Sequence, residues 1–232
     1  NTMTEPFALP NYLTNYNGGN YKLWINNDYS EMRGGVIYNF NWGNIGLIKD
    51  HIEWGDNYST SNIFSGRTPS FPLFKINLSP VKWLDFNYIH GWLVSEVIDS
   101  TKSYINTEGN FRGVNRGKYI AANMFTIMPN NKISFSFGNS IVYSDFEGGY
   151  IGYFIPFLFY KSLDHTVNHN IENQNSQMFF NLSSRSFKHL HLYTSFFIDE
   201  FQKDRIFIDS LSNFVSYKFG GKLSNYPISN VS

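Results

Sequence analysis

Hydrophobic and polar residues alternate along the segment 84–95. Leu84, Phe86, Tyr88, Trp92 and Val94 fall on one side of an extended chain, and Asp85, Asn87, Gly91 and Ser95 fall mostly on the other. The same alternation returns over 190–199, where leucine and phenylalanine alternate with histidine, tyrosine and serine. Because successive side chains of a strand point to opposite faces, both segments predict strands of a two-sided sheet. His90 interrupts the apolar side, so we expect it to lie near a membrane interface or against a partner protein.

About ten segments carry this strand pattern. They are 21–26, 36–42, 45–54, 74–79, 82–95, 119–127, 133–138, 177–182, 188–201 and 214–222. Short turns are predicted at 128–131 and 184–187, whereas the connections 56–70, 96–116 and 144–175 are long. Short turns at one end and long loops at the other are typical of antiparallel transmembrane β-barrels.

Strand alternation alone allows a soluble β-sandwich equally well, and composition favours the barrel over that alternative. Charged residues make up only 16% of the 232 residues and aromatic residues 19%, and aromatic rings are favoured at both edges of a bilayer. The formal net charge is zero, which gives no reason to expect a nucleic-acid partner. The absence of cysteine excludes disulfides, thiolate metal sites and cysteine nucleophiles.

We therefore predict an all-β fold, an antiparallel transmembrane β-barrel of the bacterial outer membrane. Residues 1–232 are expected to form a single domain that is part of a longer protein, so the barrel is expected to be incomplete in this chain. The start at Asn1, without methionine or a signal peptide, suggests a mature or trimmed product. The end, 225–232, lacks the alternating strand with a terminal aromatic residue that many bacterial barrels carry.

Ionisable residues are densest at 49–55. Lys49, His51 and Glu53 share one face of the strand predicted over 45–54, and Asp50 and Ile52 share the other. We interpret these residues as an ion-pair network that braces a barrel lumen, and the alternative is a sugar-binding or catalytic patch. The complete predicted lumen network is Lys49, Asp50, His51, Glu53, Arg116, Asp199 and Glu200.

The order of several short motifs resembles the Wzi-type capsule assembly family of outer-membrane barrels, in the version found in Bacteroidota. The motifs are Lys49-Asp50-His51 with Trp54-Gly55, then Asn62 and Ser65, then Pro69-Ser70-Phe71-Pro72, Arg116 with Ala121-Ala122, Asn173-Gln174 and Ile198-Asp199-Glu200-Phe201. The resemblance covers roughly 35–201, and members of that family are usually longer than this chain. It implies a non-enzymatic role in assembling or attaching capsular polysaccharide or exopolysaccharide, with the chain as one component of a larger outer-membrane complex.

Sugars bind to aromatic faces and to hydrogen-bonding side chains, which are abundant in and beside the long connection after residue 54. Trp54, Asn57, Tyr58 and Asn62 are our candidate glycan contacts. The alternative is that Trp54 is an interfacial anchor and that the asparagines form turns. The expected partners are outer-membrane lipid, surface polysaccharide and other outer-membrane proteins.

Other arrangements give weaker signals. His165 and His169 share the spacing of one helix face and suggest a metal site, although the surrounding asparagines favour a loop. Ser95 or Ser195, together with His189, His191 and an acid at 199–200, suggests a rim lipid hydrolase or deacylase, although no nucleophile-elbow motif is present. We expect no catalytic residue, no metal and no cofactor. The alternatives to the polysaccharide role are a porin-like transport barrel and the rim hydrolase.

Overall fold

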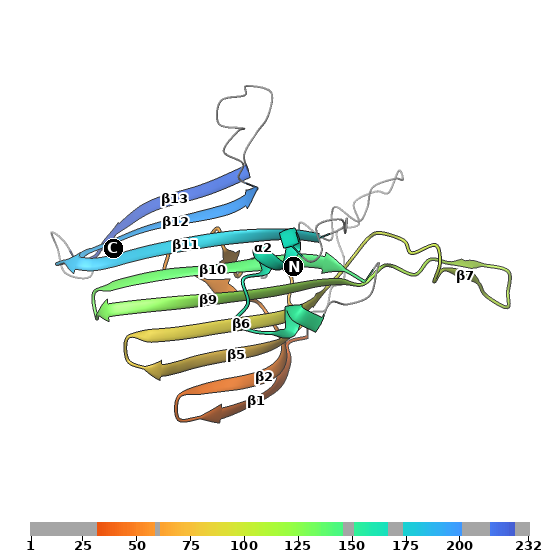
Figure 1. Ribbon diagram of the computed structural model, residues 1–232, viewed down its shortest axis with the longest axis horizontal. Coiled ribbons are helices and arrows are strands. Elements are labelled where there is room, and N and C mark those ends of the chain that lie inside the picture. Colours follow the sequence, from red (N-terminus) through yellow and green to blue (C-terminus); the bar gives the residue numbers. More distant parts are fainter. Residues whose placement is uncertain (1–31, 59–60, 146–150, 167–173, 201–213, 226–232) are drawn as a thin grey trace, which may run out of the picture.

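A single antiparallel sheet dominates the computed structural model, which describes residues 32–58, 61–145, 151–166, 174–200 and 214–225. Its strand order is β1-β2-β5-β6-β9-β10-β11-β12-β13, so consecutive long strands are neighbours (Figure 1). The nine strands are β1 (Gly34–Phe40), β2 (Gly43–Asp50), β5 (Phe71–Val81), β6 (Leu84–Leu93), β9 (Lys118–Asn130), β10 (Ile133–Ser144), β11 (Gln174–Phe187), β12 (Leu190–Glu200) and β13 (Phe214–Leu223). The prediction of a mainly antiparallel β fold is confirmed.

Small elements lie in the long connections. β3 (Glu53–Trp54) pairs with β4 (Phe64–Ser65), and β7 (Tyr104–Ile105) pairs with β8 (Phe111–Arg112). The 3-10 helix η1 (Ile151–Phe154) precedes the short helix α2 (Tyr160–Thr166). Within the described ranges, the helices are too short and too polar to cross a membrane.

The connections at the two ends of the sheet differ in length, as predicted, although residues 184–187, which were predicted to form a turn, belong to β11 and the turn follows at 188–189. Two-residue turns at 41–42, 82–83, 131–132 and 188–189 join strands at one end, which we call the short-turn end. The connections that follow β2 (51–70), β6 (94–117) and β10 start at the opposite end, which we call the long-segment end, and segment 94–117 with β7 projects from it (Figure 1). At the turn after β9, the Asn130 side chain accepts hydrogen bonds from the backbone N–H groups of Lys132 and Ile133, which fixes a tight reversal.

The sheet has two chemically distinct faces. We call the face on which α2 lies the outer face and the opposite one the inner face. Successive register partners on the outer face form an aromatic row across six strands: Phe86, Phe125, Phe137, Phe180, Phe196 and Tyr217. The adjacent row on the inner face is smaller and more polar: Asn87, Met124, Gly138, Phe179, Phe197 and Ser216.

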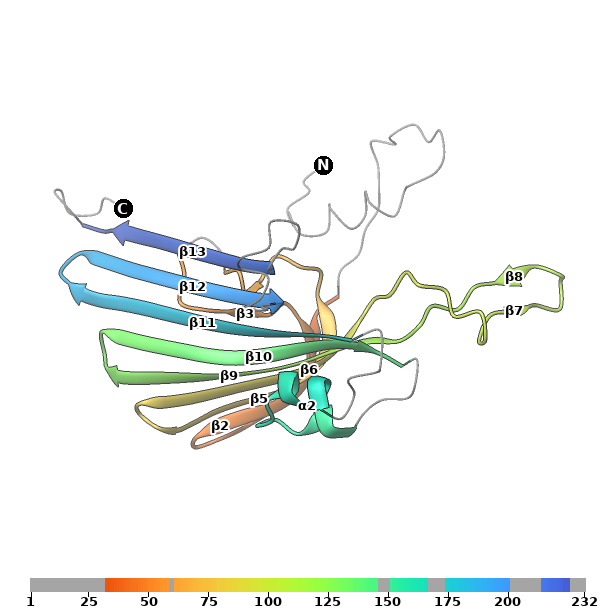
Figure 2. The same cartoon turned by 45° about the horizontal axis from the view of Figure 1, so that its top comes forward.

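Segment 51–70 crosses the inner face and shows that the sheet is curved. Only six residues lead from Asp50, the last residue of β2, to Asp56, which hydrogen-bonds to Ser183 on β11. Six extended residues span at most about 21 Å. In a flat sheet the five strand spacings from β2 to β11 would measure about 24 Å, and the path also runs from the long-segment end towards the short-turn end. The sheet therefore curls towards its inner face, and Figure 2 shows the curvature.

Apolar side chains of segment 51–70 fill this inner side. Trp54 and Ile63 are buried together with Leu73, Ile89 and Phe179 from the sheet. The end of the strand predicted over 45–54 and the long connection after it are therefore folded over the inner face, because Trp54 and Ile63 leave water by packing on the sheet.

Segment 151–160 covers part of the outer face. The Asn123 side chain donates to the carbonyl oxygens of Pro156 and Leu158, both at 2.8 Å, and the Asn139 side chain accepts from the Tyr160 N–H at 2.7 Å. These two asparagines are almost fully buried. The segment therefore satisfies the amide groups that interrupt the apolar face.

His90 is covered by the same part of the chain. Its Nε2 lies 3.0 Å from the Tyr143 hydroxyl, and the Phe154 ring stacks on the imidazole with centroids 3.9 Å apart. Only 1% of His90 is exposed. Residues of the same chain therefore cover His90, so no partner protein is needed there, and the expected position near a membrane interface stays a prediction.

The strand boundaries differ from prediction at three places. The predicted strand over 45–54 is broken, since β2 ends at Asp50 and Glu53–Trp54 belongs to the separate β3. β10 and β11 extend well beyond the alternation seen in the sequence. The predicted strand over 21–26 lies outside the described residues.

Candidate functional site

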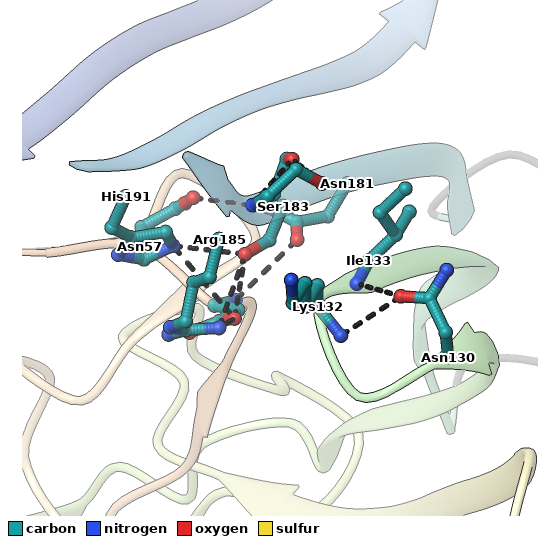
Figure 3. Close-up of polar contacts among 11 residues, drawn as sticks. Asn57, Asn130, Lys132, Ile133, Asn181, Ser183, Arg185 and His191 are labelled. Carbon is teal, nitrogen blue, oxygen red and sulfur yellow. Dashed lines mark hydrogen bonds and ion pairs between the residues drawn. The ribbon is translucent and has the colours of Figure 1, made fainter. Parts of the chain in front are cut away.

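A cluster of polar side chains joins segment 51–70 to β11, β12 and β13 on the inner face. Figure 3 shows the part of this cluster around Ser183, Arg185 and His191. We call this cluster the inner polar network. Its members are Asp56, Asn57, Asn62, Asn181, Ser183, Arg185, His191, Ser195 and Ser216. Because side chains alternate along a strand, Asn181, Ser183 and Arg185 all point from β11 towards the segment.

Asp56 is the charged centre of the network. Both terminal nitrogens of Arg185 donate to its carboxylate, with Nη2 to Oδ1 at 2.7 Å. The Ser183 hydroxyl donates to Oδ2 at 2.6 Å. The hydrogen bonds from Arg185 hold the pKa of Asp56 below its usual value, in spite of the opposing effect of partial burial. Asp56 is therefore an anion held in a two-pronged guanidinium contact.

The Ser183–His191 pair lies beside this ion pair. Ser183 Oγ and His191 Nε2 are 2.8 Å apart. An ionised carboxylate only accepts hydrogen bonds, so the single Ser183 proton points to Asp56 and His191 Nε2–H donates to the hydroxyl. The imidazole therefore does not act as acceptor of the serine proton in this arrangement, unlike the base of a hydrolytic triad.

Amide and hydroxyl groups extend the network along the strands. Asn181 Nδ2 donates to Asn57 Oδ1 at 3.0 Å, and Asn57 Nδ2 donates to Ser195 Oγ at 3.3 Å. The Ser195 hydroxyl in turn donates to Asn62 Oδ1, and Asn62 Nδ2 reaches the Ser216 carbonyl oxygen at 3.3 Å. The candidate glycan contacts Asn57 and Asn62 are thus hydrogen-bonded within the chain and hold the segment to the sheet.

Tyr58 keeps an exposed ring next to the network. Its carbonyl oxygen accepts a hydrogen bond from the Tyr193 hydroxyl at 2.9 Å, while 54% of the residue is exposed. Lys222 Nζ lies over the ring, 3.9 Å from its centroid, a cation–π geometry. Tyr58 therefore combines a fixed backbone with a ring that solvent reaches.

Trp54 is not available for ligands. Its indole packs edge-on against Phe64 with centroids 5.0 Å apart, and only 8% of the residue is exposed. The candidate role of Trp54 as a glycan contact is therefore wrong, and so is the alternative of an interfacial anchor. The burial of this ring follows from the inward path of the segment.

The predicted lumen network is dispersed. Asp50 lies on the inner face 3.8 Å from Arg33, His51 Nδ1 is 2.6 Å from the Thr68 carbonyl oxygen, and Glu53 is exposed on β3. Strand alternation places Lys49 on the outer face with Leu47, so Lys49 does not share the face of Asp50.

The other members of the predicted lumen network lie elsewhere. Arg116 belongs to the projecting segment 94–117, where its backbone N–H donates to the Val97 carbonyl oxygen. Asp199 lines a pocket of about 280 Å³ with Phe197 and Phe214, and Glu200 ends β12.

The predicted serine–histidine grouping is not assembled as expected. His189 occupies the turn between β11 and β12 with a φ of 65° and does not share a strand face with His191. Ser195 contacts Asn57 and Asn62, and Ser95 lies beyond the end of β6, near the long-segment end. His169 of the predicted metal pair lies outside the described residues. Within the described ranges, no group of three ligating side chains has the arrangement of a metal site.

Sequence reasoning missed Asp56, Asn181, Ser183 and Arg185. A signal was present, since asparagine, serine and arginine occupy alternate positions from 181 to 185 and so share one strand face. The partner of that face could not be read from the chain, because Asp56 lies more than 120 residues away.

Comparisons with known proteins give little further information. No family model matches the chain, and no curated protein matches it. A solved structure described as a NanC porin is similar over 82% of this chain and 76% of its own, with 12% identity and a TM-score of 0.41. This likeness is too weak to assign a function.

Proposed function

We propose that this chain forms the wall of a transmembrane β-barrel in the bacterial outer membrane, and that it serves surface polysaccharide without catalysing a reaction. The observation that carries the membrane part is the apolar outer face. Many of its side chains are largely exposed, among them Val36, Tyr38, Leu47, Tyr217 and Phe219. These side chains lie on strands near both edges of the sheet, and exposed apolar surface of this kind marks a membrane or protein contact.

The spacing of tryptophans along the β5–β6 hairpin supports lipid as that contact. Trp83 lies in the short turn and Trp92 near the other end of β6, and both are about half exposed. Nine residues at about 3.3 Å each cover about 30 Å along the strand. With the usual strand tilt the height is about 23 Å, close to the apolar band of about 25 Å in outer-membrane barrels.

Segment 151–160 makes the same face more apolar. It covers the buried groups of Asn123, Asn139 and His90, while Ile151, Phe154 and Phe157 are about half exposed or more. Unsatisfied amides would be costly in hydrocarbon. The backbone of segment 151–160 satisfies the buried polar groups, and its apolar side chains point outward. This combination suits a lipid environment.

The polysaccharide part rests on the inner polar network and on the resemblance to Wzi-type proteins. Exposed Tyr58 offers an aromatic face next to amide and hydroxyl groups, the chemistry that binds sugars. Segment 51–70 fills part of the inner side with Trp54 and Ile63, which favours a binding protein over a wide transport pore. Large, steady conductance steps in a planar bilayer would contradict this preference and favour the porin-like alternative.

Fluorescence quenching by brominated lipid tests the membrane part. Three variants would each keep one tryptophan, at 83, 92 or 54, with the others replaced by phenylalanine. After reconstitution into vesicles, we expect lipid brominated near the headgroups to quench Trp83 and Trp92 and to leave buried Trp54 unchanged. Equal, weak quenching of all three would contradict the proposal.

Polysaccharide retention tests the second part. Cells that lack their own copy would express the wild type, Tyr58→Ala or Tyr104→Ala, a matched control because Tyr104 is equally exposed on segment 94–117. We expect Tyr58→Ala to lower the polysaccharide retained at the surface several-fold, at equal amounts of folded protein. Wild-type retention in the Tyr58→Ala cells would count against this site.

A further inference from the structure

We propose that a row of basic side chains at the short-turn end of the inner face binds the carboxylate of an acidic saccharide, and that Asp56 occupies this position in the unliganded chain. This inference rests on the proposed polysaccharide function and specifies its ligand class. The row consists of Arg185 on β11, His191 on β12 and Lys222 on β13, and we call it the basic row.

The basic row concentrates positive charge on neighbouring strands. His191 and Lys222 are direct register partners, and Arg185 lies beside His191 through the shared contact with Ser183. Lys218, on the same face of β13, lies over the Tyr193 ring. Burial and the neighbouring Arg185 lower the pKa of His191. Arg185 and Lys222 therefore carry the positive charge of the row, and His191 lies between them as a neutral hydrogen-bonding group.

The row already holds a carboxylate in the geometry that a ligand would need. Asp56 accepts from two Arg185 nitrogens and from Ser183 Oγ, the planar contact for which a guanidinium is suited. Asp56 comes from segment 51–70 and not from the sheet. Another carboxylate can therefore replace it without breaking strand pairing.

Solvent reaches this ion pair. About half of the Arg185 side chain and 39% of the Asp56 side chain are exposed. An exposed ion pair stabilises a fold only weakly, so exchange of one carboxylate for another has a small cost. The pair is also close to Tyr58, two residues further along the segment, whose ring is exposed and lies under Lys222 Nζ.

The combination identifies the ligand class. A guanidinium that grips a carboxylate, a second cation and an exposed aromatic ring suit a pyranose that carries a carboxylate, as in a uronic acid. A neutral sugar would leave Arg185 with Asp56. An acidic peptide offers the carboxylate but no sugar ring for Tyr58, which favours a saccharide.

Binding of trigalacturonic acid to the full chain in detergent tests the proposal, with the methyl ester of the same trimer as the uncharged match. We expect the acid to bind at least about tenfold more tightly than the ester. Asp56→Ala removes the internal competitor and should tighten binding of the acid several-fold. Arg185→Lys keeps the charge but removes the two-pronged contact, and should weaken binding about tenfold. Lys75→Ala, an inner-face cation on β5, is the control and should bind as the wild type does.

The outcomes separate this inference from the function on which it rests. If acid and ester bind equally well, the carboxylate site is wrong while the polysaccharide role stands. If neither trimer binds to wild type or to Asp56→Ala, the inference is wrong, and the retention experiment with Tyr58→Ala then decides the polysaccharide role separately. Triglutamate binding as tightly as trigalacturonic acid would show that the row recognises carboxylates alone and would overturn the assignment to a saccharide. Circular dichroism of each variant excludes loss of folding as the cause.

Discussion

Some side chains of segment 51–70 pack in an apolar cluster, and others form hydrogen bonds with the sheet. Trp54 and Ile63 enter the apolar cluster with Leu73, whereas Asp56 and Asn57 meet polar groups of β11 and β12. Residues that look alike as candidate sugar contacts therefore have different roles. Burial removes Trp54 from the surface, hydrogen bonding within the chain engages Asn57, and Tyr58 remains exposed.

Replacement of Trp54 by alanine tests its place in the core. We expect the free energy of unfolding to fall by about 3–5 kcal/mol, because the variant loses a large buried ring and leaves a cavity. The matched control is Trp42→Ala, in the exposed turn between β1 and β2, which should change it by about 0.5 kcal/mol or less. Equilibrium denaturation followed by circular dichroism measures both. Equal effects would contradict the core assignment.

The ion pair of Asp56 gives a pH dependence with a defined sign. Because folding lowers the pKa of Asp56, its contribution is fully present above the unfolded value near 3.8 and is lost as the pH falls through the lower folded value. We expect the wild type to exceed Asp56→Asn in stability by about 1 kcal/mol at neutral pH, a small figure because the pair is partly exposed. The difference should shrink below about pH 4 in denaturation curves. A difference that is independent of pH would show that the charge of Asp56 contributes nothing.

At the level of elements, segment 151–160 is the least expected part of the structure. It follows the outer face through contacts to β6, β9 and β10, and its backbone groups pair with Asn123 and Asn139. The short helix α2 follows directly and packs against β10 and β11. The polar interruptions of the apolar face are therefore the attachment points of this segment and not defects of the strands.

Asn139→Ala should loosen segment 151–160. The substitution removes the acceptor of the buried Tyr160 N–H and the donor to Asn123, and leaving such groups unpaired costs about 1–3 kcal/mol. We expect faster hydrogen exchange at the Tyr160 amide and lower stability. Asn87→Ala, on the inner face of β6, is the control and should leave exchange at Tyr160 unchanged. Unchanged exchange in Asn139→Ala would contradict the attachment.

At the level of the whole molecule, the sheet has two faces and two ends. The faces separate apolar from polar side chains, and the ends separate two-residue turns from long segments. In an outer-membrane barrel the short turns face the periplasm and the long segments face outward. The proposed orientation therefore places segment 94–117 outside the cell and the basic row near the periplasmic end, so a polysaccharide retained through Tyr58 would be held at a point inside the barrel.

Protease access tests this orientation. Trypsin added to intact cells should cut within segment 94–117, at exposed Arg112, and should spare Lys132 and Lys188 in the short turns. After permeabilisation of the outer membrane, cleavage at the two turn lysines should also appear. Mass spectrometry of the released peptides distinguishes the sites. Cleavage at Lys132 in intact cells would contradict the orientation.

The sequence alone determined the β fold, the positions of most strands and the contrast between short turns and long connections. These features are local, since alternation sets the two faces of a strand and the spacing between apolar runs sets the length of a turn. The alternation from Leu84 to Val94, for example, leads directly to the outer-face positions of Phe86 and Tyr88.

Only the tertiary structure decided which residues meet. It placed Trp54 in a core with Phe179, brought Asp56 to Arg185 and covered His90 with Phe154. Each of these contacts joins residues more than 60 positions apart. The contacts depend on the curvature of the sheet and on segments 51–70 and 151–160, which fold over opposite faces of it. No local pattern encodes that path, because it is set by how much apolar surface the connections can bury against the assembled sheet.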